Sequence, residues 1–207
     1  MNQLTATKSN LDEARRLLAF SRGGYRILDR KRSVLMREFM RLKAEALELA
    51  EQADREESEF YHAIAMAKVS EGAEEVENIS RSVSADEGIT VLRESVMGVE
   101  LPRILSHEGQ MNPSYSLYRS TESMDRAFQA ALKFKQTFIR VLEAISSLQR
   151  LSAEIRKSGK RADSINKLQL PRYEAEVKRL SQALEEKDRE DLFRLKRGKE
   201  KLASRRF

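Results

Sequence analysis

The sequence predicts a mainly helical fold in which two long helices pair antiparallel as a left-handed coiled coil, with a short β-hairpin between them. Apolar residues recur at alternating spacings of three and four from Leu11 to Ala67, and again from Leu117 onward. Charged residues make up 35% of the chain and there are only three prolines, a composition that favours long helices over sheets. A β-branched segment with a central glycine lies between the two helical patterns.

The first helix is expected within residues 1–69. A mean spacing of 3.5 residues keeps an apolar stripe against one partner only if the helices wind around each other with a left-handed twist. At about 1.5 Å per residue, the segment Leu11–Ala67 would reach roughly 85 Å. Only Ser21, Arg32 and Glu56 interrupt the stripe. The helix should continue through Gly23-Gly24, although each glycine costs about 1 kcal/mol relative to alanine; a functional hinge there is the alternative.

Residues 70–116 are expected to connect the two helices. Residues 70–88 are acidic and small, so the first helix must end among them. The segment Ile89–Pro102 alternates in part and predicts a hairpin. Met97, Gly98 and Pro102 are the hairpin residues singled out: Gly98 suits a bulge or a bend, and Pro102 suits an edge position because proline cannot donate to a ladder. Residues 106–116 read as a loop.

The second helix is expected within residues 117–207, with a kink or restart near Pro171, which lacks the N–H that a helix interior requires. Two helices of similar length, separated by about fifty residues, can pair antiparallel within one chain. A parallel homodimer of each helix is the competing geometry. The intramolecular pairing is preferred because it needs no second chain. The predicted seam residues are Leu18, Tyr25, Leu28, Leu35, Phe39, Leu42, Leu49, Phe60, Phe134, Phe138, Ile145, Leu148, Leu180 and Leu184.

No part of the sequence indicates an active site, a metal site or a cofactor. Gly23-Gly24 is not followed by the Lys-Ser/Thr of a phosphate loop. His62 and His107 stand alone, and the chain contains no cysteine, whereas a structural metal needs several N or S ligands at close spacing. The carboxylate clusters Glu56-Glu57-Glu59 and Glu185-Glu186-Asp188 are expected to lie on solvated helix faces.

The net charge of +6 is unevenly distributed along the chain. Residues 1–44 and 111–207 are basic, and residues 45–110 are acidic, so an antiparallel fold would bring both basic parts to one end. Such charge would also suit nucleic-acid binding, but no stacking aromatics are interleaved with the basic residues. A scaffolding coiled coil that self-associates is a second alternative. Without an apolar run of about 20 residues, the chain is expected to be soluble and cytoplasmic.

Four segments resemble one family in the right order. Gly24–Leu35 resembles the Gly-x-x-Leu-Leu-Lys-x-Lys-Arg-Asp-x-Leu signature of the D subunit of the V-type and archaeal A-type ATPases, with departures at Ile27, Asp29 and Ser33. Val96–Pro102 resembles that family's Met-Gly-Val-x-x-Pro hairpin. Ile165–Tyr173 is similar to its Val-Asn-Ala-Leu-Glu-x-x-x-Ile-Pro element, with shorter spacing. Glu185–Lys196 is similar to its Glu-Glu-x-Glu-Arg-Glu-Glu-x-x-Arg-Leu-Lys ending.

The resemblance implies a central rotor shaft without catalytic residues of its own. In that family the paired terminal helices stand inside a ring of alternating catalytic and regulatory subunits (A and B). The hairpin end associates with the small F subunit and with a funnel-shaped subunit (C/d) on the membrane rotor. The shaft would therefore be peripheral to a membrane, without direct insertion or nucleic-acid contact. Charge-assisted ring contacts are expected from Lys31, Arg32, Arg194, Lys196 and Arg197.

Overall fold

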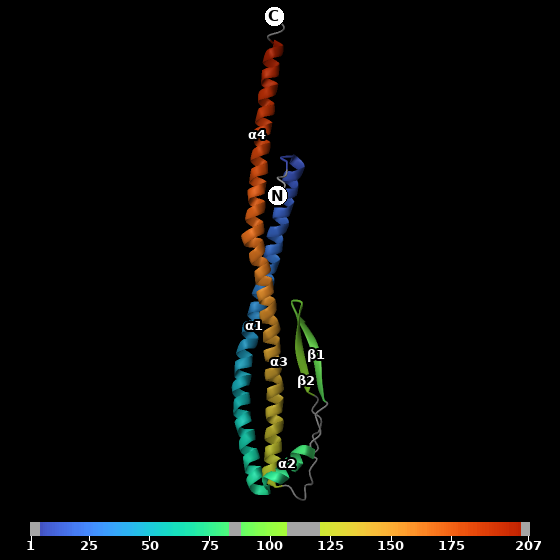
Figure 1. The fold of residues 1–207 in the computed structure, drawn as a ribbon, viewed down its shortest axis with the longest axis vertical. Helices are drawn as coiled ribbons and strands as arrows, with labels where there is room; N and C mark the ends of the chain where they lie inside the picture. The colour runs from blue at the N-terminus through green and yellow to red at the C-terminus, as the bar shows by residue number, and fades with distance from the viewer. Residues whose placement is uncertain (1–4, 83–87, 107–120, 204–207) are drawn as a thin grey trace. The chain divides into compact units, whose positions relative to one another are not determined.

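A computed structural model describes residues 5–82, 88–106 and 121–203 of the chain (Figure 1). The chain divides into two units, of which the first combines an early and a late stretch of sequence and the second is continuous. Unit 1 comprises Met1–Arg32 and Arg156–Phe207, and unit 2 comprises Ser33–Ile155. The elements, in chain order, are α1 (Lys8–Glu71), α2 (Ala73–Ser82), β1 (Ile89–Val96), β2 (Val99–Ser106), α3 (Glu122–Ser164), the π-helical turn η1 (Ile165–Gln169) and α4 (Leu170–Ala203).

In unit 1, the start of α1 packs antiparallel against α4 and the end of α3. Leu11 and Ala14 form a buried cluster with Leu180. Further along α1, the Arg22 guanidinium lies 2.7 Å from the Glu174 carboxylate. Residues later in α1 therefore contact residues earlier in α4, which is the antiparallel arrangement that the sequence predicts.

The N-terminus of α1 is capped by Thr7, whose Oγ1 accepts a hydrogen bond from the amide of Asn10 at 3.3 Å. The helix then continues without a break through Gly23-Gly24. A Cβ atom at Gly23 would have no neighbour within 4 Å, and one at Gly24 would meet only the Ile165 side chain, at 3.9 Å. Neither glycine is therefore required by close packing between the helices.

The irregularity expected near Pro171 takes the form of a π-helical turn just before it. The amide of Leu170 donates to the carbonyl of Ile165, five residues back, and this wider turn is the usual way to insert one extra residue into a helix. Pro171 is the second residue of α4, where its missing N–H is tolerated more easily than in a helix interior.

In unit 2, α1 and α3 pair antiparallel over successive apolar clusters. Leu49 and Ala53 pack with Val141, and the rings of Phe60 and Phe134 stack with centroids 6.0 Å apart. The other clusters are Leu35 with Leu151, Ile155, Val99 and Leu101, and Ala67 with Val76, Met124 and Ala127. The core of this unit is thus a seam two helices wide, which the hairpin and α2 cover in places.

The first helix ends at Glu71, and Gly72 follows with a φ of +93°, a backbone conformation that favours glycine. The short helix α2 was not expected from the acidic composition of residues 70–88. Its first turn contains Glu74 and Glu75, which favour a helix N-terminus. Val76 is buried against α1 and α3, and Ile79, three residues later, packs against the same cluster. The acidic segment therefore has the apolar face through which a short helix can pack.

The hairpin lies where the sequence places it, but it is longer than Ile89–Pro102. Strand β1 pairs antiparallel with β2 from Ile89 opposite Ser106 to Val96 opposite Val99. Met97 and Gly98 form the turn with φ values of 51° and 78°, and positive φ at both central residues matches the twist of a two-residue hairpin. The rest of the expected loop, residues 107–116, and the expected helix start at 117–120 lie outside the described residues.

The predicted fold class is confirmed. The chain is dominated by a long N-terminal helix and a long C-terminal helical stretch, with one two-stranded antiparallel hairpin between them among the described residues. The left-handed supercoil stays a prediction from the 3.5-residue spacing.

Candidate interaction surfaces

No group of three or more His, Cys, Asp or Glu side chains is placed to bind a metal ion in the described part of the chain. His62 is exposed, and His107 lies outside the described residues. Glu185, Glu186 and Asp188 are exposed on α4, as expected for a solvated face.

The predicted seam residues differ in how far the structure buries them. Phe138 and Ile145 remain 44% exposed, beside the seam rather than in it. Three predicted residues are fully or nearly buried: Leu35, Leu49 and Leu180. Nine are partly buried: Leu18, Tyr25, Leu28, Phe39, Leu42, Phe60, Phe134, Leu148 and Leu184.

The hairpin packs against part of the buried face of α3. Val141, Ala144 and Leu151 are buried, and Leu151 packs in one cluster with Leu101 of β2. A spacing rule based on two helices alone takes no account of this third layer. It assigned Ile145 to the seam where the structure buries the small neighbouring residue Ala144.

The hairpin is attached to α3 through the backbone of one strand. The Arg150 guanidinium donates to the carbonyl of Glu100 at 2.9 Å, and the amide of Ile104 donates to the Glu143 carboxylate at 2.8 Å. Pro102 lies between them and has no N–H to satisfy, which agrees with its predicted edge position. The outer edge of β2 is thus occupied by α3, whereas every residue of β1 from Ile89 to Ser95 is exposed.

At the tip of the hairpin, Met97 is 46% exposed beside Gly98. The sequence-predicted hairpin residues Met97, Gly98 and Pro102 therefore lie at the turn and on the anchored strand of unit 2.

The five basic residues predicted to contact a ring all belong to unit 1, but they do not form a single patch. Arg32 is exposed, and its guanidinium lies along Gly159, 3.8 Å from where a Cβ atom would stand. Lys31 beside it is partly buried. Arg194 lies roughly 50 Å beyond Gly159 along α3, η1 and α4, at about 1.5 Å per residue. It pairs there with Glu190 at 3.6 Å.

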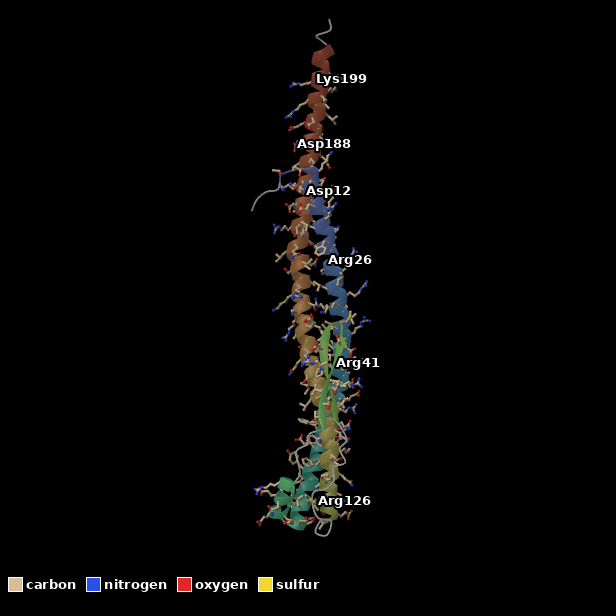
Figure 2. All side chains as sticks on the ribbon, turned by 90° about the vertical axis from the view of Figure 1, so that its right-hand side faces the viewer. Asp12, Arg26, Arg41, Arg126, Asp188 and Lys199 are labelled. Atoms are coloured by element: carbon tan, nitrogen blue, oxygen red, sulfur yellow. The ribbon has the colours of Figure 1, made fainter. Side chains whose placement is uncertain are left out.

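The last part of α4 has no helix packed against it among the described residues. Leu184 is the final residue of α4 that packs in the cluster with Leu11. From Glu185 to Lys199 every side chain is exposed, including the basic residues Lys196 and Arg197. Figure 2 shows these side chains projecting around the helix between the labelled Asp188 and Lys199.

The second half of this segment, residues 192–199, is apolar as well as basic. Leu192, Phe193 and Leu195 are 67%, 72% and 71% exposed. Adjacent large apolar side chains without cover are typical of a surface that another protein binds. We name the segment Glu185–Lys199 the bare tip.

Sequence reasoning missed a buried carboxylate in unit 2. Glu56, expected on a solvated face, is only 3% exposed. Its Oε1 accepts a hydrogen bond from the Gln52 amide at 2.8 Å, and the Lys133 ammonium lies 3.8 Å away. Burial raises the pKa of Glu56, but hydrogen bonding to Thr137 and Gln52 and the charge of Lys133 outweigh it and hold the pKa below its usual range. The signal in the sequence was its place on the apolar stripe.

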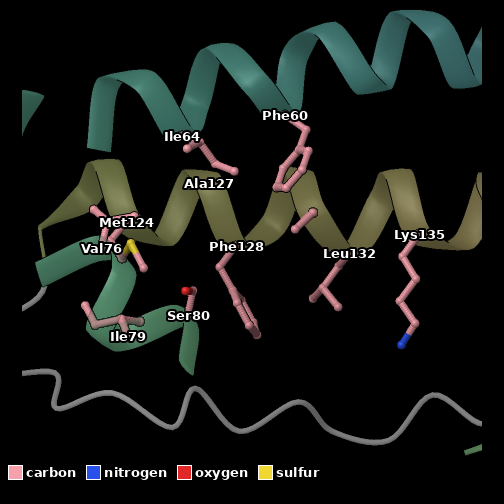
Figure 3. Close-up of a pocket in the computed structure, with 11 residues that line it drawn as sticks. Phe60, Ile64, Val76, Ile79, Ser80, Met124, Ala127, Phe128, Leu132 and Lys135 are labelled. Carbon is pink, nitrogen blue, oxygen red and sulfur yellow. The ribbon is translucent and has the colours of Figure 1, made fainter. Parts of the chain in front are cut away.

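An apolar pocket of about 300 Å³ lies between α1, α2 and α3 of unit 2 (Figure 3). Phe128 and Leu132 point into it from α3, and its polar lining is limited to Ser80 and Lys135. The lining therefore lacks the set of converging polar groups that is typical of a small-molecule site. The lining residues are Phe60, Ile64, Val76, Ile79, Ser80, Met124, Ala127, Phe128, Ala131, Leu132 and Lys135.

The helices that the structure describes include none with a stretch long and apolar enough to span a bilayer.

Comparison with known proteins gives a consistent result over nearly the whole chain. Residues 10–200 match the family model described as the ATP synthase D subunit. The V-type ATP synthase D subunit of Thermotoga neapolitana is 33% identical, covering 95% of this chain and 97% of that protein. The protein of the same name from Thermus thermophilus is 32% identical, with 99% and 92% covered. The A-type ATP synthase D subunit of Thermococcus kodakarensis is 31% identical, with 96% and 94% covered.

The match extends from residue 10 to residue 200. It therefore includes both long helical stretches and the central hairpin with Met97-Gly98 at its turn. The chain belongs to the family of ATP synthase D subunits.

Proposed function

We propose that this chain is the central-shaft subunit of a V/A-type rotary ATPase. It transmits torque between ATP hydrolysis or synthesis in a catalytic ring and ion translocation by a membrane rotor. The observation that carries the proposal is the bare tip, an exposed helix segment whose second half is apolar and basic, in a chain that matches the family along almost its full length. The chain contributes no catalytic residue and acts within a multi-subunit complex.

The paired helices supply the asymmetry that a shaft needs. In each unit, the two packed segments have different sequences and run in opposite directions, so the faces of the pair differ. A ring that surrounds such a pair meets a different surface in each rotational position. Coupling then follows from linkage: the shaft shifts the nucleotide affinity of a ring subunit only by binding its conformations unequally.

The surfaces are assigned as follows. The bare tip, with Arg194, Lys196 and Arg197, inserts into the ring of A and B subunits. Lys31 and Arg32, on the α1 part of unit 1, make further contacts with the ring. Guanidinium and ammonium groups would make charge-assisted hydrogen bonds there. Unit 2, with the hairpin, binds the small F subunit and seats on the funnel-shaped subunit (C/d), which places the chain at the cytoplasmic side of a membrane-bound complex.

The test is assembly with the ring. The chain is co-expressed with the A and B subunits, and ring-bound chain and ATPase activity are measured. Reversal of Arg194, Lys196 and Arg197 to glutamate is expected to weaken binding to the ring at least tenfold, with a steep dependence on salt. The matched control reverses three exposed cations of unit 2, Lys68, Arg81 and Arg126, and should leave ring binding unchanged.

Three outcomes would count against the proposal. Failure of the intact chain to enter the ring is the first. Self-association of the purified chain through the apolar seam, detected by sedimentation, would instead favour a scaffolding coiled coil. Duplex or single-stranded nucleic acid is included as a competitor, because binding that persists at physiological salt would favour the nucleic-acid alternative.

A further inference from the structure

We propose that Glu56 is a register latch: its buried carboxylate, held by Thr137, Gln52 and Lys133, fixes α1 and α3 of unit 2 in one alignment. The proposal does not rest on the proposed function. It concerns how two helices with a repetitive apolar seam select a single pairing among several similar ones.

An apolar seam with a seven-residue repeat does not specify its own register well. A shift of α3 by seven residues brings another set of seam positions opposite α1, at little cost in apolar burial. A polar group in the seam discriminates, because only one alignment satisfies it. Glu56 is such a group: it interrupts the apolar stripe, and its side chain is 4% exposed.

The residues of α3 show which interaction discriminates. In the observed register, Thr137 and Lys133 lie next to Glu56. Seven residues before and after Thr137 the chain has Ala130 and Ala144, neither of which can donate a hydrogen bond to a carboxylate. Seven residues before and after Lys133 it has Arg126 and Arg140, so a cation is present in all three alignments. The hydroxyl of Thr137 is therefore the group that only the observed register supplies.

The carboxylate has little tolerance for losing a partner. Its Oε2 is buried and already has no hydrogen-bond partner among the described residues. A shifted alignment would leave the charge with still fewer donors in a buried position. Hydrogen bonds to charged groups change populations by roughly tenfold to a hundredfold, which is enough to exclude a shifted register from an equilibrium ensemble.

The chain allows a direct measurement of register because it has no cysteine of its own. Ser70 and Ser123 face each other in unit 2 with their hydroxyl oxygens 3.2 Å apart. Cysteines at these two positions would report the observed register by forming a disulfide. Cysteines at Ser70 and Ala130 would report a shift of seven residues.

The experiment uses the full chain in both cysteine backgrounds, oxidised at high dilution and followed as intramolecular cross-link on non-reducing gels. With Glu56 intact, we expect the Ser70→Cys/Ser123→Cys pair to close and the Ser70→Cys/Ala130→Cys pair to stay open. Glu56→Leu should lower the ratio of observed to shifted cross-link at least tenfold, while the urea midpoint stays equal or rises.

Two further variants keep the test decisive if Glu56→Leu fails to fold. Thr137→Val removes only the hydroxyl and should lower the same ratio, and Thr137→Ser should restore it. Glu59→Ala is the matched control, because Glu59 also binds Lys133, at 3.3 Å, but is 63% exposed; it should leave the ratio unchanged. An unchanged ratio in both Glu56→Leu and Thr137→Val, or an equal effect of Glu59→Ala, would overturn the proposal.

Discussion

The adjacent glycines in α1 allow a quantitative test of whether this helix needs a soft point. Replacing both Gly23 and Gly24 with alanine should stabilise the chain by about 1.5–2 kcal/mol, because each exchange raises helix propensity by about 0.8–1 kcal/mol. The structure predicts no steric cost. The first new methyl group has no neighbour within 4 Å, and the second meets Ile165 at 3.9 Å, an ordinary van der Waals distance.

The assay is urea unfolding followed by circular dichroism, with hydrogen exchange of unit 1 amides as a local measure. Gly72→Ala is the matched control, since Gly72 also has open space around it but has a φ of +93°. Alanine is strained in that conformation, so this exchange should destabilise the chain by about 1–2 kcal/mol. The two glycine sites should therefore move the urea midpoint in opposite directions.

A neutral or destabilising effect of the double exchange at Gly23 and Gly24 would refute the reasoning, because it would mean that α1 is not a regular helix at this level. The assembled complex gives a second result. Unchanged ATPase coupling by the stabilised variant is expected if the glycines are a tolerated weak point. Loss of coupling in a chain that is more stable would favour the hinge alternative.

Three further outcomes are expected. Leu151→Ala should cost about 2–5 kcal/mol in urea unfolding, since Leu151 is fully buried, whereas Leu17→Ala, at a 41% exposed site, should cost far less. The pKa of Glu56 is lowered in the folded chain. The stability that the ionised Glu56 carboxylate contributes is therefore present above its unfolded pKa near 4.5 and is lost as the pH falls through its folded pKa. In urea unfolding at a series of pH values, Glu56→Gln should flatten this acid dependence. Arg150→Met removes the hydrogen bond to Glu100 and should cost about 1 kcal/mol, with faster exchange of β2 amides; unchanged exchange would contradict the anchoring described here.

Periodicity was sufficient to predict the elements whose packing repeats. Apolar residues at spacings of three and four located the long helices, because this spacing places residues such as Leu35 and Leu180 on the helix face that is buried against the partner helix. A bulge or bend at Gly98 could be predicted because glycine readily adopts positive φ, but the two-residue turn with positive φ at Met97 as well was not.

Periodicity could not predict features that depend on a third layer or on a single polar contact. The hairpin packs against Leu151 of α3, and Ala144, which a two-helix rule leaves beside the seam, is buried. The buried carboxylate of Glu56 is stabilised by Thr137 and Lys133 of α3, which lie about eighty positions later in the sequence. Helix α2 was missed because the acidic, small residues of 70–88 indicated only that the first helix ends there, although the acids in the first turn of α2 favour a helix N-terminus.

The bare tip has a consequence for the order in which a complex would form. Beyond Leu184, helicity rests on local propensity and on pairs such as Arg194 with Glu190, each contributing only a few tenths of a kcal/mol. An isolated helix of this length is marginal in water. In the free chain the segment should therefore be cut readily by trypsin and lose helix on mild heating. Enclosure by a partner would protect it, so resistance to cleavage at this end becomes a simple gauge of assembly.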